Sequence, residues 1–296
     1  MESEATQSGL YLIEVNDLYG FIDKTGSVVI KPQFTWAWDF SEGLAPVDTN
    51  GDGNWDAYID ERGQVVLKTS YGLVDSFSGG LAVARPDDAN WGFIDPAGKF
   101  TIPVQYQGAS GFSEGLAAVE EGNRWGYIDT AGRFVIQPQF RQAERFSEGL
   151  AAVQTEQGWG FIDQTGRFVI QPGFTAVSDF GSGMAPATKG NDADTWLWGF
   201  IDRTGKWVIE PKFNDALSYS SGLAAVLSGV DVSNPGTMAG RWGYIDTSGK
   251  YVIQPQFFDA NPFSGGLASV AFPTDDPTQG RAAYIDLTGK TVWMEP

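Results

Sequence analysis

The sequence predicts an all-β repeat protein, and three observations lead to that prediction. A Tyr/Phe-Ile-Asp-x-x-Gly segment occurs eight times along the 296 residues, so the chain is an array of one recurring unit. The composition includes 38 glycines and 15 prolines, which favour many tight turns over long helices. With 42% hydrophobic and 14% aromatic residues, the chain can also fill a continuous core.

The most regular part of the unit is its Asp-x-x-Gly segment. This spacing is typical of a type I turn, in which the first residue accepts a backbone N–H and the glycine adopts a left-handed conformation. The aspartates therefore have a structural reason to recur. They are Asp23, Asp60, Asp95, Asp129, Asp163, Asp202, Asp246 and Asp286, and the glycines are Gly26, Gly63, Gly98, Gly132, Gly166, Gly205, Gly249 and Gly289.

Length variation is confined to one connection per unit. A Trp-Gly pair, as at Trp125, occupies the first two positions of the module, which we call the Trp-Gly slot even where other residues replace the pair. A Gly-Leu-Ala segment follows 24 residues later. From that glycine to the next Trp-Gly slot the spacing is 10, 13, 11, 10, 10, 15, 20 and 16 residues through the eight units. We therefore expect the variable connections to lie on one edge of the molecule, where repeat proteins place binding loops.

The fourth unit shows how each unit divides into strands. The pattern predicts three strands, 116–120, 125–129 and 134–137, and Pro138 is expected to end the last one because proline cannot donate to a ladder. The chain then crosses to the next unit. Phe140 and Phe146, with small Ala143 between them, are predicted to fill the interface between neighbouring units.

These patterns predict eight three-stranded antiparallel units in an all-β array. An open curved solenoid is favoured over a closed eight-bladed propeller, because a minimal unit of 34 residues holds three strands more comfortably than four. Residues 1–8 are predicted to form a disordered N-terminus and residues 9–296 a single array. The units are expected to start near residues 9, 43, 80, 115, 149, 183, 222 and 266.

The repeated pattern resembles a known family. Trp-Gly-Tyr/Phe-Ile-Asp-x-x-Gly-Lys/Arg-x-Val-Ile-x-Pro-x-Phe is similar to the repeat of the WG-repeat (KWG) family of bacterial proteins, and it covers residues 9–296. The resemblance implies a β-rich repeat array that serves as an interaction module, and it supplies no catalytic residues.

Composition excludes several classes of function. The net charge of -18 repels phosphates, so nucleic acid and anionic membranes are disfavoured as partners, whereas a basic protein or a metal cation suits the charge. The absence of cysteine and histidine removes thiol chemistry, histidine-based triads and ordinary zinc sites. The start of the chain lacks the features of a secretory signal, and no stretch is long and apolar enough to span a membrane, so a cytoplasmic location is expected. An exported or periplasmic protein is the alternative if a signal has been removed.

One loop departs from the repeat toward metal binding. The stretch DTNGDGNWD, residues 48–56, resembles the Asp-x-Asp/Asn-x-Asp-Gly-x-x-Asp calcium loop of EF-hands, dockerins and FG-GAP propellers. Calcium takes six to eight oxygen ligands, and alternate residues of a tight loop can supply them. A structural Ca²⁺ site is therefore predicted, although a polar hairpin tip explains the same residues. Its ligands are Asp48, Asn50, Asp52, the Asn54 carbonyl and Asp56.

A second departure is aromatic. Trp36 and Trp38 occupy the connector positions that hold Gln142 and Glu144 in the fourth unit. Trp196 lies in a length-variable loop. Exposed tryptophans anchor protein interfaces or stack on sugar rings, although an inserted loop can also fold its tryptophan onto its own unit. These three residues are the predicted partner-binding positions.

A third departure is acidic. Glu42, Glu114 and Glu148 recur in Ser-Glu-Gly, and paired carboxylates can hydrolyse glycosides. A glutamate that recurs beside a turn glycine and is replaced by glycine or serine in other units is more simply a solvated turn residue. The chain is therefore expected not to be an enzyme.

The sequence predicts a non-enzymatic scaffold that binds another macromolecule, in the first place a protein. The expected binding loops are those of the sixth to eighth units, with Trp36 and Trp38 as further contacts. A carbohydrate-binding module is the alternative from another class, and a carboxylate-dependent glycoside hydrolase is a weaker one.

Overall fold

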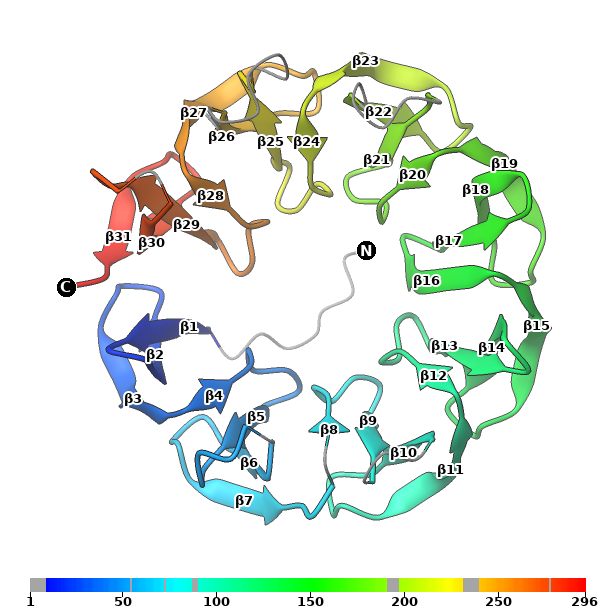
Figure 1. Cartoon of the computed structure of the whole chain (residues 1–296), viewed down its shortest axis with the longest axis horizontal. Coiled ribbons are helices and arrows are strands. Elements are labelled where there is room, and N and C mark those ends of the chain that lie inside the picture. Colours follow the sequence, from blue (N-terminus) through cyan, green and yellow to red (C-terminus); the bar gives the residue numbers. More distant parts are fainter. Residues whose placement is uncertain are drawn as a thin grey trace. The chain divides into compact units, whose positions relative to one another are not determined.

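A computed structural model of the chain describes residues 9–53, 55–71, 73–86, 90–190, 197–230, 240–276 and 278–296. Every regular element of this described part is a β-strand, which confirms the all-β class. The chain divides into two compact units, the first ending at Gly149 and the second beginning at Leu150. Each unit is a succession of antiparallel sheets (Figure 1).

Unit 1 contains the first sixteen strands. They are β1 (Leu10–Val15), β2 (Leu18–Asp23), β3 (Val28–Phe34), β4 (Trp36–Ala37), β5 (Ala45–Asp48), β6 (Ala57–Ile59), β7 (Val65–Lys68), β8 (Leu73–Val74), β9 (Ala82–Arg85), β10 (Trp91–Ile94), β11 (Phe100–Tyr106), β12 (Gly108–Ala109), β13 (Leu116–Glu121), β14 (Arg124–Asp129), β15 (Phe134–Phe140) and β16 (Gln142–Ser147).

Unit 2 contains the remaining strands. They are β17 (Leu150–Thr155), β18 (Gly158–Ile162), β19 (Phe168–Phe174), β20 (Ala176–Val177), β21 (Met184–Thr188), β22 (Trp198–Asp202), β23 (Trp207–Phe213), β24 (Asp215–Ala216), β25 (Ala224–Ser228), β26 (Arg241–Ile245), β27 (Tyr251–Phe257), β28 (Asp259–Ala260), β29 (Leu267–Pro273), β30 (Gly280–Asp286) and β31 (Thr291–Met294).

The prediction of three-stranded units in an open solenoid is wrong. In the described residues the sheets run β4–β5–β6–β7, β8 to β11, and so on to β28 to β31, each with four strands in chain order, whereas the first sheet, β1–β2–β3, has three. A four-stranded antiparallel meander is the blade of a β-propeller. The predicted connector supplies the missing strand, because a short segment such as β4 pairs with the strand after it.

The Ser-x-Gly segment explains why the connector returns to its own sheet. Ser41 and Leu44 exchange both backbone hydrogen bonds, at 2.9 and 3.1 Å, around a two-residue loop. Both loop residues have positive φ, 52° at Glu42 and 79° at Gly43, as a type I′ hairpin requires. This tight hairpin joins the first and second strands of a blade. The predicted inter-unit connection therefore contains a strand, and this is the strand that the three-stranded prediction lacks.

The Asp-x-x-Gly turns have the predicted geometry. At Asp129, the backbone carbonyl accepts a hydrogen bond from the N–H of Gly132 at 2.9 Å, and Gly132 has a φ of 77°. The Asp129 carboxylate accepts hydrogen bonds from the N–H groups of Ala131 and Arg133, each at 3.0 Å. The other seven turns repeat this pair of backbone-to-carboxylate bonds. The eight aspartates therefore stabilise the turns between the third and fourth strands.

The proline of the repeat lies inside the fourth strand, so the expectation that it ends the pairing is wrong. Pairing across Pro138 resumes at Trp125↔Phe140 after a bulge. The bulged backbone approaches the Trp-Gly glycine so closely that a Cβ on Gly126 would lie 2.5 Å from the Ile136 carbonyl oxygen. Glycine is needed here because only a residue without a side chain admits this approach.

Aromatic pairs join successive blades, as the sequence analysis expected for Phe146. In unit 1 the ring of Tyr127 on β14 packs against Phe146 on β16, with ring centroids 4.8 Å apart, and Phe146 is 1% exposed. The same contact recurs between neighbouring blades within each unit at 4.7 to 5.0 Å. Phe140 and Ala143 are also buried.

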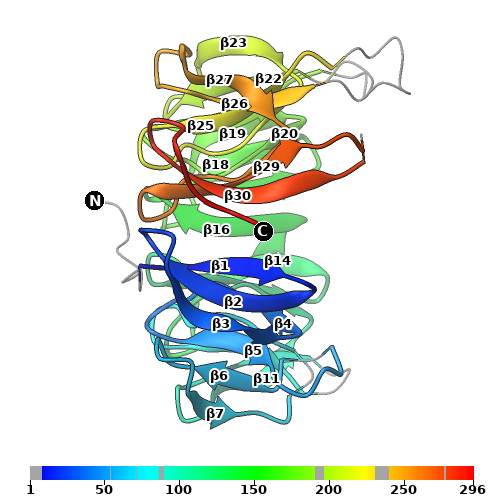
Figure 2. The ribbon, with the colours of Figure 1, turned by 90° about the vertical axis from the view of Figure 1, so that its left-hand side faces the viewer.

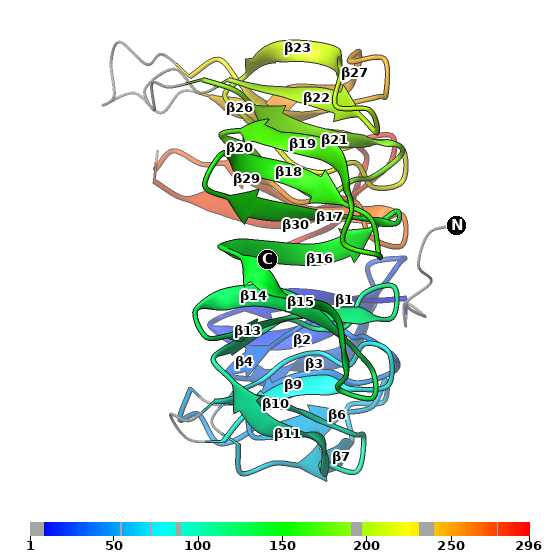
Figure 3. The same cartoon turned by 90° about the vertical axis from the view of Figure 1, so that its right-hand side faces the viewer.

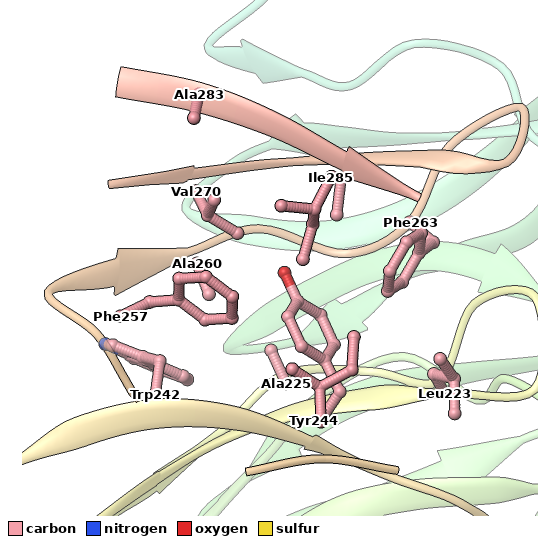
Figure 4. Close-up of a cluster of buried hydrophobic side chains, with 12 residues drawn as sticks. Leu223, Ala225, Trp242, Tyr244, Phe257, Ala260, Phe263, Val270, Ala283 and Ile285 are labelled. Atoms are coloured by element: carbon pink, nitrogen blue, oxygen red, sulfur yellow. The ribbon is translucent and has the colours of Figure 1, made fainter. Parts of the chain in front are cut away.

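Figure 4 shows one such interface in unit 2. Tyr244 and Phe257 come from the blade β24–β27, and Phe263, Val270 and Ile285 come from the blade β28–β31. Tyr244 lies between them, with its ring centroid 4.9 Å from that of Phe263. The hydrophobic core of each unit therefore lies between blades, where a single blade could not have buried these rings.

Polar contacts reinforce the same interfaces at the hairpins. The Ser113 hydroxyl donates a hydrogen bond to the Phe146 carbonyl at 2.6 Å, and the Ser41 hydroxyl does the same to the Phe77 carbonyl. The Glu42 carboxylate accepts hydrogen bonds from the N–H groups of Gly79 and Gly80 in the next hairpin, at 2.8 and 3.0 Å. Glu42 is therefore a bridge between hairpins rather than only a solvated turn residue.

Candidate functional site

The two edges of each blade have different characters. The Ser-x-Gly hairpins and the Asp-x-x-Gly turns lie at one edge, and the length-variable loops between the second and third strands lie at the other, together with the start of the first strand. For unit 1 this can be followed in Figure 2, where β1 runs to its loop with β2 on the right and the β2–β3 turn is on the left. The antiparallel strands β17, β18 and β19 of unit 2 can be followed in Figure 3. Within each unit, the prediction that length variation falls on one edge is confirmed.

Two large aromatic side chains are exposed at the variable edge of the second blade. Trp36 begins β4, pairs with Asp48 in β5, and is 51% exposed. Trp38 follows two residues later and is also 51% exposed. The Trp36 ring stacks on Tyr19, with centroids 5.6 Å apart and planes at 20°, so one face of the indole is covered. The structure therefore places both predicted tryptophans at the surface and fixes the orientation of Trp36.

No other blade has tryptophan at these positions. The residues that stand in place of Trp36 in the following blades are small, polar or aliphatic: Leu73, Gly108, Gln142, Ala176, Asp215 and Asp259. In the β12–β15 blade a Cβ on Gly108 would lie 2.9 Å from the Trp125 indole, so the Trp-Gly tryptophan covers this position. In the second blade the Trp-Gly slot holds Asp56 instead, and Trp36 begins β4.

Two neighbours complete this aromatic surface. Burial raises the pKa of Tyr19, and the hydrogen bond between its hydroxyl and the Glu14 carboxylate raises it further. The phenol therefore stays neutral and donates to Glu14. On the other side, Trp55 packs edge-on against Trp38, with centroids 5.7 Å apart. Sequence reasoning missed Trp55, although its place one residue before the Trp-Gly slot marks it as a displaced repeat tryptophan.

The loop beside these aromatics is organised around Asp48. This aspartate is 1% exposed, and its carboxylate accepts hydrogen bonds from the N–H groups of Asn50, Gly51 and Gly53 at 2.8 to 3.0 Å. Burial works to raise the pKa of Asp48, but these donors and the Thr35 hydroxyl outweigh it and hold the pKa below its usual range. Thr35 directly precedes Trp36, so the loop is attached to the aromatic surface.

The predicted calcium ligands are only partly in position to receive a cation. The Asp56 carboxylate accepts hydrogen bonds from the N–H and hydroxyl of Thr49, at 2.8 and 2.7 Å, and the Asn50 side-chain oxygen accepts one from the Asp52 N–H at 2.9 Å. Within the described ranges, no three acidic groups gather as a metal site would require. Asn54 lies outside the described residues. Calcium binding by this loop stays a prediction.

The remaining predicted contacts lie elsewhere. Trp196 falls outside the described residues, as do 231–239 in the loop before β26. The Glu114 carboxylate accepts a hydrogen bond from the Gly149 N–H at 2.9 Å, the same bridge that Glu42 makes. Both glutamates thus have structural roles in unit 1. Within the described chain, no helix has the length and apolarity that crossing a bilayer requires.

The chain is similar in fold to solved structures of other proteins. The chain is similar to the computationally designed Ika8 protein, with a TM-score of 0.53 and 11% identity over 99% of this chain and 89% of that one. The likeness concerns the fold alone. A quinonprotein alcohol dehydrogenase-like protein from Bacteroides thetaiotaomicron matches with a TM-score of 0.49 and 10% identity, over 97% of this chain and 75% of that one. PorZ, of the type-IX secretion system of Porphyromonas gingivalis, matches with a TM-score of 0.43 and 11% identity, over 95% of this chain and 43% of that one.

The family comparison covers most of the chain. No curated protein matches the sequence. The sequence profile of the WG containing repeat matches seven segments, 19–55, 57–88, 91–125, 125–157, 159–191, 198–229 and 242–271. Each segment contains an Asp-x-x-Gly turn, and all but the segment 57–88 also contain the Trp-Gly slot and the bulged strand. The chain belongs to the WG-containing repeat family.

Proposed function

We propose that this WG-repeat protein is a non-enzymatic interaction protein that binds a protein partner through the variable edge of its blades. The observation that carries the proposal is the pair of half-exposed tryptophans, Trp36 and Trp38, at that edge of the second blade. Exposed indoles are costly to leave in water and are the residues that most often anchor protein interfaces. The variable loops 190–196, 227–240 and 272–281 remain part of the proposal as further contacts.

The arrangement of carboxylates supports binding over catalysis. The Asp-x-x-Gly carboxylates each accept two backbone hydrogen bonds, and Glu42 and Glu114 bridge neighbouring hairpins. These hydrogen bonds stabilise turns and hairpins. The proposal therefore assigns no reaction to the chain.

A glycan is the second candidate partner, because sugar rings also stack on exposed indoles. The charge around the site favours a protein. The loop 48–56 at this edge contains three acidic residues, Asp48, Asp52 and Asp56, and no basic one, which suits a basic surface. A neutral glycan would gain nothing from this charge.

Site-specific photo-crosslinking tests the proposal. The photoreactive residue p-benzoylphenylalanine is placed at position 36 and, as a matched control, at position 142, which is the same repeat position in the β16–β19 blade. We expect protein adducts from position 36 in an extract of the source cells and few from position 142. Equal adduct patterns at both positions, or no protein adduct from position 36, would contradict the proposal.

A further inference from the structure

The inference concerns the chemistry of the partner at the Trp36–Trp38 surface, and it rests on the proposed function. We propose that this surface recognises a cationic peptide segment whose arginine side chains lie against the two indoles. Three features of the described residues carry the proposal: the half-exposed indole rings, the acidic rim and the placement of the basic residues.

The first feature is the exposed surface of the Trp36 and Trp38 indoles. Trp36 is stacked on Tyr19 on one side only, and half of its side chain remains exposed. Trp38 makes a T-shaped contact with Trp55, with the ring planes at 77°, and half of its side chain remains exposed. The two tryptophans are separated by one residue, which in an extended chain places them on the same side about 6.6 Å apart. A guanidinium group is planar and stacks on such faces, and tryptophan is the best aromatic partner for a cation.

The acidic rim comes second. Glu14 accepts the Tyr19 hydroxyl hydrogen bond beside the stacked pair, and Asp17 lies in the exposed turn that follows β1. Across the surface, Asp52 is exposed in the loop that begins at Asp48, and Asp56 ends that loop. Carboxylates attract a cation over a range of several ångströms.

The placement of basic residues comes third. The first two sheets contain four of them, and only Lys68, which ends β7 and pairs with Ala57, lies at the variable edge. Lys24 and Arg62 lie in the Asp-x-x-Gly turns at the opposite edge, and Lys31 and Lys68 lie in the strands β3 and β7. At this edge of the first two sheets, the carboxylates of Glu14, Asp17, Asp52 and Asp56 therefore outnumber the one cation, Lys68. This charge complementarity distinguishes an arginine-bearing peptide from a neutral glycan.

Titration with a matched pair of peptides tests the inference. The probes are an acetylated, amidated (Gly-Arg)₄ peptide and its citrulline counterpart, which has nearly the same shape and no charge, and the readout is calorimetry supported by tryptophan fluorescence. We expect the arginine peptide to bind the full chain at least about tenfold more tightly than the citrulline peptide. Binding should weaken when NaCl is raised from about 0.05 to about 0.5 M.

Variants locate the binding. The double substitution Trp36→Ala/Trp38→Ala should lower the affinity of the chain for the arginine peptide by at least about tenfold. Gln142→Ala, at the matched position of another blade, should leave this affinity unchanged. Circular dichroism shows whether the double variant is folded, and the single variants Trp36→Phe and Trp38→Phe provide a second, milder pair if it is not. Equal affinity for both peptides, no binding of the arginine peptide, or undiminished binding by the tryptophan variants would overturn the inference.

A glycan probe separates the remaining outcomes. Chitohexaose binding that is lost in the double variant, without arginine-peptide binding, would overturn the cationic partner in favour of a sugar. Protein crosslinks from position 36 combined with no preference for the arginine peptide would leave the proposed function standing and reject only this inference.

Discussion

The blades β4–β7 and β12–β15 are built from the same repeat but use their variable edges differently. In β12–β15 the Trp-Gly tryptophan, Trp125, covers Gly108, and the loop between the second and third strands is a short turn at Gly122 and Asn123. In β4–β7 the slot holds Asp56, the loop runs from Asp48 to Asp56, and Trp36 begins the first strand.

At the opposite edge the two blades are alike. Ser41 and Ser113 each donate to the carbonyl of an aromatic residue in the next blade, and Glu42 and Glu114 each cap N–H groups of the next hairpin. The difference teaches that one edge and the inter-blade core maintain the fold, while the other edge is free to change. The repeat position that Gly108 occupies beneath Trp125 in one blade holds the half-exposed Trp36 in another.

The largest expected effect tests whether the core is equivalent in the two blades. Phe146→Ala removes the ring that packs on Tyr127, and Phe77→Ala removes the matching ring on Tyr58, at 4.8 and 4.9 Å. Each substitution should lower the free energy of unfolding by roughly 3 to 5 kcal/mol, because the rings are buried and leave a cavity. Urea denaturation measures both losses. Val135→Ala, an exposed outer-strand control, should cost less than about 0.5 kcal/mol.

The next effect tests the difference in the fourth strand. A Cβ on Gly126 would meet the backbone of Ile136, Gln137 and Pro138, so Gly126→Ala should cost about 1 to 3 kcal/mol. In the second blade the same slot already holds Ala57, and pairing runs directly from Tyr58↔Leu67 to Ala57↔Lys68 without a shift. Ala57→Gly should therefore cost about 1 kcal/mol or less. Equal losses at the two positions, measured by thermal unfolding, would show that the bulge is not what requires glycine.

A third prediction concerns the loop that only the second blade has. Asp48→Asn should lower the free energy of unfolding at neutral pH by about 1 to 3 kcal/mol, because the buried carboxylate accepts several hydrogen bonds. The pKa of Asp48 is depressed in the folded state, so its contribution is present above the unfolded-state pKa of about 3.9 and is lost as the pH falls through the folded-state pKa. Denaturation curves at a series of pH values should show the wild type and the variant converging in acid. A constant difference at all pH values would contradict this account.

The smallest expected effect is that of calcium on the same loop. If Asp48, Asn50, Asp52, Asn54 and Asp56 bind the ion, millimolar Ca²⁺ should raise the melting temperature by a few degrees, because the ion binds only the folded loop. Asp52→Ala should remove the rise, and Asp129→Ala, in an ordinary turn, should not. No binding heat in a calorimetric titration of chelator-treated protein would reject calcium and leave Asp48 as the organiser of the loop.

Much of the regular part of the molecule could be predicted from the sequence. The turn aspartates, the interfacial Phe146 and the edge that carries the length variation all follow from local patterns, because each depends on a few residues at fixed spacing. The fourth strand could not be predicted, because segments such as Trp36–Ala37 are two residues long and are recognised only once the Ser-x-Gly hairpin is known to fold back. The expectation that Pro138 ends its strand was wrong, because a bulge accommodates the proline ring and the strand continues beyond it.

The candidate site, too, could be predicted from the sequence only in part. Exposure of Trp36 and Trp38 follows from their replacement of Gln142 and Glu144 in the repeat, so the sequence predicted it. Their partners could not be predicted, because Tyr19 lies in another blade and Trp55 is displaced by one residue from the repeat position. Nor does spacing show that the Asp48 carboxylate faces the N–H groups of its own loop.

The central claim is that the variable edge of the second blade binds while the rest of the blade maintains the fold. Capture by Trp36→Ala/Trp38→Ala, compared with the wild type at equal folded fraction, tests it most directly. The wild-type chain and Gln142→Ala should retain the same protein from an extract of the source cells, and the double variant should lose it while still unfolding in one cooperative transition. Retention of that protein by a folded double variant would contradict the claim.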